Sequence, residues 1–113
     1  FDLVQRTARG ELTDADLEGR AGEYAQGHRW GRVVSVPRGG DRLAEALVPL
    51  STDGHGFTLV VDDVWTTGAS LRAVASGLRS GGSVAGLVIF ARTMLPDWVE
   101  AFWTAGTARG GRW

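Results

Sequence analysis

The chain has 113 residues, of which 43% are apolar and 22% charged, and its formal net charge is -1. These values describe one small globular domain and exclude both a disordered chain and a protein that coats nucleic acid through positive charge. Without cysteine the chain has no disulfide framework and no thiolate metal site, and no apolar run approaches the roughly 20 residues of a membrane span. We therefore expect a single cytoplasmic domain over residues 1–113, with loosely ordered ends at 1–10 and 104–113 and no nucleic-acid or membrane partner.

All twelve basic residues are arginine, so the sequence contains no lysine. A mechanism that needs a lysine ammonium group is therefore excluded. The sequence also begins at Phe1 and not at methionine, which leads us to expect a fragment or a processed chain.

The first predicted element is a helix over residues 14–26. Thr13 is a suitable N-cap, and Asp16 stands at the third helical position, where its carboxylate can complete a capping box. Leu17 and Tyr24 then lie on one face of the helix. Two glycines within this stretch weaken it by about 1 kcal/mol each relative to alanine, so we expect packing on the core to stabilise it.

Short apolar strands alternate with helices through the middle of the chain. β-Branched and apolar runs predict buried strands, and apolar residues at helical spacing predict the helices between them. The predicted order is a strand at residues 32–36, a helix at 41–47, a strand at 57–63, a helix from Leu71 to Leu78 and a strand at 84–90.

Continuous apolar strands that alternate with helices are typical of a parallel sheet covered on both faces. We therefore predict an α/β fold of three layers, α/β/α, with a mainly parallel sheet of three strands and one or two short additions, joined by right-handed crossovers. Ligands bind beyond the carboxyl ends of the strands in such sheets. The turns at residues 37–40 and 62–68 follow two of these strands and are the candidate site.

The spacing of apolar residues within 95–103 is harder to assign to a helix or a strand. Pro96 predicts the start of a short helix within residues 95–103. Trp98, Phe102 and Trp103 recur at helical spacing in this segment, which favours a core or dimer contact over a platform that stacks on a base. His28, at the end of the first helix, is interpreted as a capping or packing residue.

The strongest chemical pattern is the string at residues 60–70. Asp62 and Asp63 end an apolar strand, and hydroxyl residues surround Gly68 at the start of the next helix. Glycine lets the backbone close around an anion, and a helix start offers unpaired N–H groups, so this turn suits a phosphate. The carboxylates suit the hydroxyls of a sugar, directly or through hydrated Mg²⁺. Together these features predict a ribose 5-phosphate site.

Two plainer interpretations apply to parts of this string. A bare Thr-Thr-Gly is more often only a helix cap, and an acidic pair after a strand also occurs in receiver domains. In receiver domains, however, the phosphate acceptor lies on a later strand, and residues 84–90 contain no aspartate. The complete string is therefore much more specific than either of its parts.

Residues 60–70 resemble the phosphoribosyl diphosphate motif of the type I phosphoribosyltransferases, which is a hydrophobic strand, two acids and a Thr-Thr-Gly-x-Ser/Thr loop. Residues 34–40 resemble the diphosphate-binding loop that lies upstream in this family. Segments near both ends are similar to short orotate phosphoribosyltransferase-like proteins of phages and actinobacteria. The resemblance covers about residues 12–103 and implies a truncated type I phosphoribosyltransferase-like fold.

The resemblance also implies an activity and a set of site residues. The reaction would transfer 5-phosphoribose from phosphoribosyl diphosphate to a nucleobase, orotate or another pyrimidine, with release of diphosphate. Asp62, Asp63 and Arg38 are the expected catalytic residues, and the two aspartates would also hold Mg²⁺ through water and substrate. The expected substrate-binding residues are Pro37, Arg38, Gly39, Gly40, Val64, Trp65, Thr66, Thr67, Gly68, Ala69 and Ser70.

The chain departs from the family pattern between the two motifs. Residues 51–56 stand where full-length members have a long hairpin that closes over the reacting centre, and the lysines of orotate-type enzymes are absent. His55 could serve as an acid there, although an exposed turn histidine is the plainer interpretation. A non-catalytic ribose-phosphate sensor, a structural remnant and a homodimer that completes the site all remain compatible with the sequence.

Overall fold

The computed structural model describes residues 13–37, 39–52, 56–78 and 83–104. Within these ranges a four-stranded parallel sheet has the order β1-β2-β3-β4, which confirms the predicted α/β class. Of the predicted loose ends, only Thr104 is described, and it is the last residue of a strand. The elements are α2 (Asp14–Gly27), β1 (Trp30–Ser35), α3 (Asp41–Leu47), the short 3-10 helix η1 (Val48–Leu50), β2 (Phe57–Trp65), α4 (Ala69–Leu78), β3 (Val84–Ala91) and β4 (Val99–Thr104).

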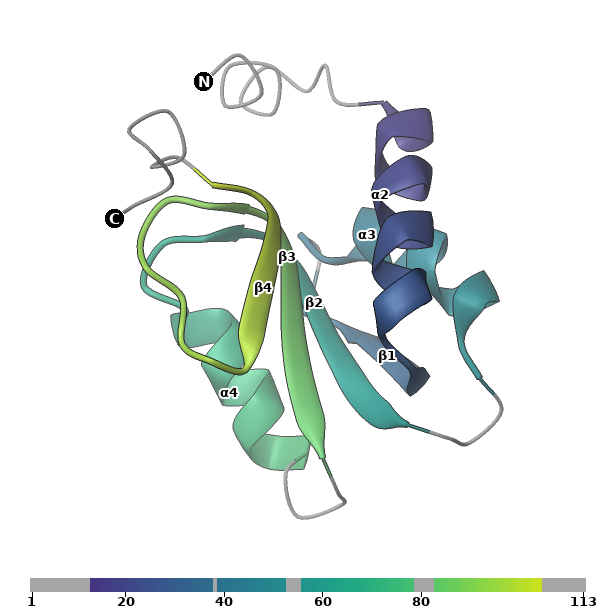
Figure 1. Cartoon of the computed structure of the whole chain (residues 1–113). Coiled ribbons are helices and arrows are strands. Elements are labelled where there is room, and N and C mark those ends of the chain that lie inside the picture. The colour runs from purple at the N-terminus through teal and green to yellow at the C-terminus, as the bar shows by residue number, and fades with distance from the viewer. Residues whose placement is uncertain (1–12, 38, 53–55, 79–82, 105–113) are drawn as a thin grey trace.

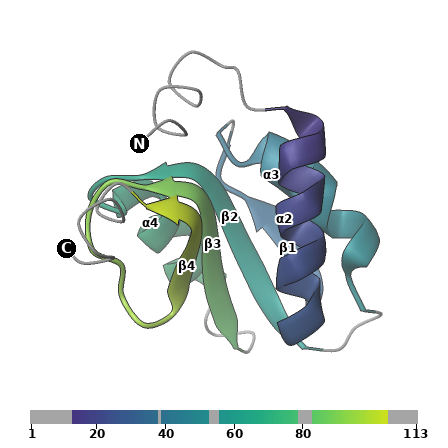
Figure 2. The same cartoon turned by 45° about the horizontal axis from the view of Figure 1, so that its top comes forward.

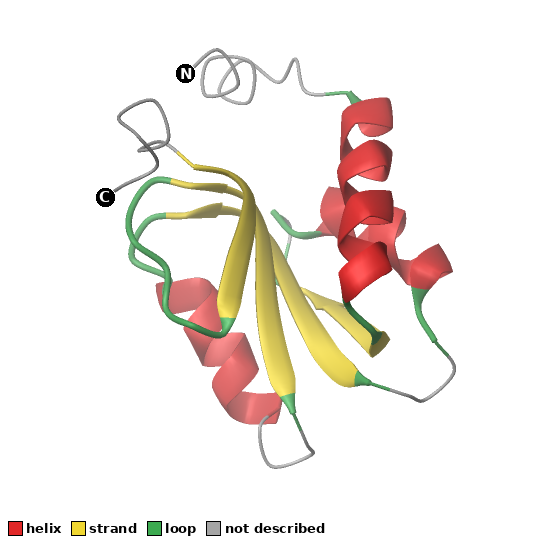
Figure 3. Ribbon diagram, in the orientation of Figure 1, coloured by secondary structure: helices red, strands yellow, loops and turns green. Residues whose placement is uncertain are grey.

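Helices cover both faces of the sheet, as the three-layer prediction requires. Figures 1 and 3 show α2 and α3 on one face and α4 on the other, and Figure 2 shows the same arrangement from a tilted view. Leu59 and Val61 of β2 face the α2 and α3 side, whereas Val60 packs with α4. All three residues are fully buried, which explains why the centre of β2, residues 59–61, is continuously apolar.

The first helix is held by the predicted cap and by its aromatic end. The Thr13 hydroxyl accepts a bond from Asp16 N at 3.1 Å, and Asp16 Oδ2 accepts one from Thr13 N at 3.0 Å, which completes the capping box. At the other end, His28 caps the helix, stacks on Tyr24 with a centroid distance of 3.9 Å and contacts Glu100 of β4 through Nε2 at 3.0 Å. The interpretation of His28 as a capping and packing residue is confirmed.

The crossovers that join the first three strands have opposite hands. β1, β2 and β3 are neighbours in this order and run parallel, so both crossovers move across the sheet in the same direction. Because α3 and α4 lie on opposite faces (Figure 1), one of the two connections is left-handed. The expectation of right-handed crossovers throughout is therefore wrong. Leu43 and Leu47 of α3 are fully buried in the same cluster as α2, and this packing holds α3 on that face.

The predicted helix within residues 95–103 is wrong, because Val99–Thr104 forms β4. The strand pairs in parallel with β3, and its approach begins where Gly86 N donates to Trp98 O at 2.7 Å. A Cβ on Gly86 would lie 2.9 Å from Val99 Cγ2, so this glycine makes room for the strand. Pairing with the edge of β3 thus overrides an apolar spacing that is ambiguous between helix and strand.

The aromatic side chains of this segment pack as strand residues. Phe102 and Trp103 are half-buried against the cluster on the α2 side, and their ring centroids lie 6.1 Å apart. Trp98, which precedes the strand, packs on the α4 side. The core contact predicted for these residues is confirmed, but Phe102 and Trp103 lie on a strand and not on a helix. Among the described helices, none is long and apolar enough to cross a membrane.

Candidate functional site

The turn after β1 meets two acidic residues near the carboxyl end of β2, which extends to Trp65 and so continues two residues beyond the predicted strand end. The pairing of β1 with β2 ends at Ser35 and Val61, and directly after it Val36 N donates to Val61 O at 2.8 Å. A Cβ on Gly39 would lie 2.5 Å from Oδ1 of Asp63 and 2.6 Å from Oδ1 of Asp62. The structure therefore brings the two predicted motifs into direct contact.

The residues of the first turn are held mainly by backbone contacts. Pro37 is exposed at the end of the strand, and Arg38 lies outside the described residues. Gly40 is buried and is the N-cap of α3: its N–H donates to Val36 O at 2.9 Å, and its carbonyl accepts from Ala44 N at 2.9 Å. A side chain at Gly40 would collide with the Val61 carbonyl. Gly40 thus has a structural role, whereas Gly39 faces the acid pair.

The two aspartates differ in their surroundings. Asp62 is half-buried and Asp63 is exposed. Burial, and then the side chain of Asp63, raises the pKa of Asp62 to about 6. Backbone amides also bind the pair, since Asp63 N donates to Asp62 Oδ1 at 2.8 Å and Val64 N donates to Asp63 Oδ1 at 2.7 Å. Backbone bonds therefore orient the pair, and the raised pKa of Asp62 favours its protonated form more than an exposed aspartate would.

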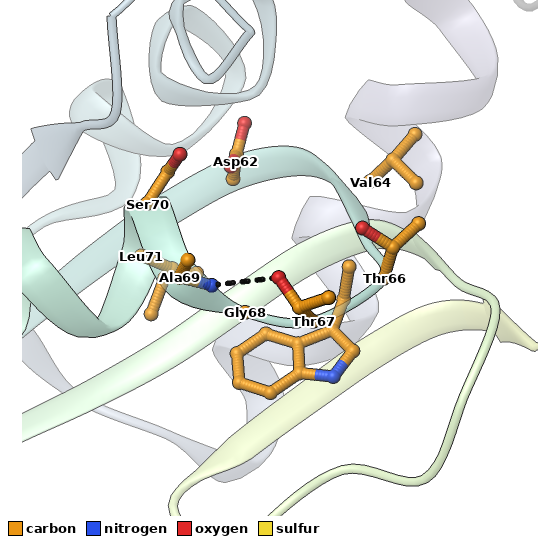
Figure 4. Close-up of a pocket in the computed structure, with 9 residues that line it drawn as sticks. Asp62, Val64, Thr66, Thr67, Gly68, Ala69, Ser70 and Leu71 are labelled. Atoms are coloured by element: carbon orange, nitrogen blue, oxygen red, sulfur yellow. Dashed lines mark hydrogen bonds between the residues drawn. The ribbon is translucent and has the colours of Figure 1, made fainter.

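A pocket of about 80 Å³ lies at the turn between β2 and α4. One water molecule needs roughly 10–15 Å³, so the pocket has room for a group larger than water. Figure 4 shows its lining, with the side chains of Asp62 and Ser70 pointing the same way. The lining includes eight of the residues that the sequence analysis named, together with Leu71, and their role in binding a substrate stays a prediction. The residues are Asp62, Val64, Trp65, Thr66, Thr67, Gly68, Ala69, Ser70 and Leu71.

The backbone of this turn combines a glycine in the left-handed region with the start of a helix. Gly68 has φ +78, in the left-handed region that glycine adopts without strain. The Thr67 hydroxyl accepts from Ala69 N at 3.3 Å, and Arg72 N donates to Gly68 O at 2.9 Å to close the first turn of α4. Amides in the first turn of a helix have no intrahelical partner and favour anions. The turn can therefore hold a phosphate group at the carboxyl edge of the sheet.

Two residues after β3 anchor the turn and had no role in the sequence analysis. Arg92 N donates to Trp65 O at 2.8 Å, and the Thr93 hydroxyl donates to Thr66 O at 2.6 Å. The signal that could have indicated them is their place directly after the third strand, since ligand sites gather beyond the ends of neighbouring parallel strands. Both side chains are exposed at this edge.

The acid pair fits a metal that arrives with a substrate better than a site built by the protein alone. Mg²⁺ is commonly held by one or two carboxylates together with substrate phosphates and water. Asp62 and Asp63 supply two adjacent carboxylates, each with one oxygen bound to a backbone amide. Within the part of the chain that the structure describes, no three His, Cys, Asp or Glu residues gather as a metal cluster. The residues present are thus compatible with Mg²⁺ bound through a diphosphate substrate.

Comparison with known proteins supports the fold. The chain matches no protein-family model and no curated protein sequence. A purine phosphoribosyltransferase from Pyrococcus horikoshii Ot3 has a similar structure, with a TM-score of 0.56 over 83% of this chain and 89% of that chain. The sequence identity is 18%, so this likeness establishes the fold alone. The predicted phosphoribosyltransferase-like fold is confirmed, and the finer resemblance to orotate-type proteins stays a prediction.

Proposed function

We propose that the protein is a phosphoribosyltransferase, which transfers 5-phosphoribose from phosphoribosyl diphosphate to a nucleobase and releases diphosphate. The observation that carries this proposal is the contact between the Gly39 turn and the acid pair, beside the Thr66–Ser70 turn. A phosphate site, a sugar site and a diphosphate site would then follow one another along a single edge of the sheet. The shared fold with a purine phosphoribosyltransferase adds support.

Each part of the substrate has a proposed partner in this arrangement. The pocket at residues 66–70 binds the 5-phosphate through backbone amides and hydroxyls. Asp62 and Asp63 accept hydrogen bonds from the ribose hydroxyls, and their negative charge favours the positive charge that develops on the ribose ring. Arg38 and the backbone of Gly39 hold the diphosphate. Bound with the substrate, Mg²⁺ would neutralise charge on the departing group.

The acceptor base is the least constrained part of the proposal. We propose orotate or another pyrimidine, on the resemblance of the sequence. Purines are the alternative to test, because the similar structure is a purine phosphoribosyltransferase.

A second candidate function is a ribose-phosphate sensor or regulatory domain without catalysis, and the connection before β2 favours it. Thr52 N donates to Trp30 O at 2.8 Å, and Phe57 N donates to Arg29 O at 3.4 Å. The described ends of this connection therefore lie at the amino edge of the sheet, opposite the candidate site. His55, the proposed substitute acid, lies outside the described residues. If no segment covers the site, the reacting carbon is open to water, which weakens electrostatic stabilisation and favours a role without catalysis.

Two measurements test these proposals in sequence. Calorimetric titration with phosphoribosyl diphosphate, with and without Mg²⁺, should show binding that Mg²⁺ strengthens. Diphosphate release is then followed with orotate, uracil, adenine, guanine and hypoxanthine. Release that depends on a base supports the transferase, binding without release supports the sensor, and the absence of binding in all conditions refutes both.

A further inference from the structure

The indole ring of Trp65 forms the floor of the turn that makes the pocket. Trp65 is the last residue of β2 and is 2% exposed. It belongs both to the core cluster under α4 and to the lining of the pocket. A Cβ on Gly68 would collide with Cη2, Cζ2 and Cζ3 of the indole. The backbone of the turn therefore rests directly on the benzo half of the ring.

Two further contacts fix Trp65 relative to the turn. Its carbonyl accepts the bond from Arg92 N at 2.8 Å, which joins the end of β2 to the segment after β3. On α4, the Arg72 guanidinium lies 5.1 Å from the centroid of the indole, at cation–π distance. Arg72 N also binds Gly68 O, so one residue contacts both the ring and the turn.

We infer that Trp65 is a positioning residue, whose indole supports Gly68 and thereby sets the affinity of the Thr66–Ser70 turn for a phosphate group. The inference rests on the proposed function, because the ligand is the phosphate of a phosphoribosyl compound. Trp65 is among the residues expected to bind substrate, but its action is indirect: the indole holds the backbone of Gly68 and so preorganises the turn for a phosphate group.

A purely structural role for Trp65 would also bury its ring, so loss of stability does not separate the two interpretations. Trp30 provides the matched control. It is fully buried, belongs to the cluster on the opposite face, and its indole N–H donates to Leu47 O at 3.2 Å. It begins β1 and therefore lies at the amino edge of the sheet, away from the turn.

The experiment compares Trp65→Phe with Trp30→Phe. Phenylalanine keeps an aromatic ring but lacks the outer atoms of the indole that touch Gly68. Inorganic phosphate and ribose 5-phosphate are titrated calorimetrically, at a temperature where circular dichroism shows all variants folded. We expect Trp65→Phe to weaken both affinities about tenfold, and Trp30→Phe to leave them unchanged.

A second pair of variants tests the contact itself. In the parent, Gly68→Ala should weaken phosphate binding further than Trp65→Phe does, while leaving it measurable at high ligand concentration, because the new methyl group collides with the indole and the positive φ disfavours alanine. In the Trp65→Phe background the space is open, so the double variant should bind phosphate more tightly than Gly68→Ala alone. Two independent structural losses would instead make the double variant the weaker binder.

The outcomes separate this inference from the proposed function. If the parent binds ribose 5-phosphate and Trp65→Phe binds it equally well, the positioning role is overturned and the proposed function stands. A double variant weaker than Gly68→Ala alone would overturn it as well. If the parent binds neither ligand, the proposed function fails and the inference fails with it.

Discussion

Replacement of Gly39 with alanine is expected to disable the acid pair while leaving the fold intact. The backbone at Gly39 does not have a positive φ, so alanine meets no conformational penalty there. The obstacle is steric, since the new methyl group would lie 2.5 Å from Asp63 Oδ1 and 2.6 Å from Asp62 Oδ1. Because Asp63 is exposed, its side chain can rotate away without disturbing the core.

The size of the effect follows from these distances. Carbon–oxygen contacts normally start at about 3.3 Å, so each carboxylate must move by roughly 0.7–0.8 Å. Hydrogen bonds to charged groups contribute about 1.5–3 kcal/mol, so loss of one such bond to the ribose weakens binding at least about tenfold. A displacement of about 1 Å in a positioned group also costs on the order of 100-fold in rate.

The assay is the dissociation constant for phosphoribosyl diphosphate with Mg²⁺, together with the rate of diphosphate release. Gly77→Ala is the matched control, because Gly77 lies on the exposed side of α4 and a Cβ there meets nothing within 4 Å. This control should gain about 0.5–1 kcal/mol of stability and bind like the parent. Unchanged binding in Gly39→Ala, or an equal loss in both variants, would refute the proposed contact between the turn and the acid pair.

Further predictions concern the acid pair and the connection before β2. Burial, followed by the neighbouring Asp63, raises the pKa of Asp62 from its ordinary 3.8 to about 6, so Mg²⁺-dependent binding should weaken as pH falls through about 6. Since the folded state holds this proton more tightly than the unfolded state, the unliganded protein should also lose stability as pH rises from 3.8 to about 6. Both effects should disappear in Asp62→Asn, the first in ligand titrations at several pH values and the second in melting curves. An unaltered pH response in this variant would contradict the assignment of the raised pKa to Asp62. Asp63→Asn should remove most of the Mg²⁺-dependent affinity with little change in melting temperature, and an equal Mg²⁺ response in variant and parent would argue against its role. Turnover with any base should stay below about 10 per second, the ordinary enzyme median, and a faster rate would show that the short connection is no handicap.

Much of the fold could be predicted because its two central strands, β2 and β3, are buried on both faces. Residues 59–61 are a β-prone apolar run at the centre of β2, and the capped helix after Thr13 carries its own start signal. The segment before Thr104 could not be assigned in the same way. Its apolar residues fit either period, and the open edge of β3 that selects the strand is set by tertiary pairing.

The candidate site was predictable where local backbone chemistry defines it. Gly68 and its hydroxyl neighbours indicate an anion turn from their types alone, and the structure groups them around one pocket. The anchor from Thr93 depends on a contact 27 residues away in sequence, which no local pattern contains. The hand of each crossover likewise depends on which face a helix buries, so it follows from packing and not from the order of elements.

The central claim is that a phosphoribosyl group binds at the turn between β2 and α4. The most direct measurement is a titration of ¹⁵N-labelled protein with phosphoribosyl diphosphate and Mg²⁺, followed by amide chemical shifts. We predict saturable shifts concentrated at residues 66–71, with further shifts at Gly39 and Asp63. An unchanged spectrum at saturating ligand would contradict the claim. Shifts confined to the surface around His28 and Glu100, away from this turn, would contradict it as well.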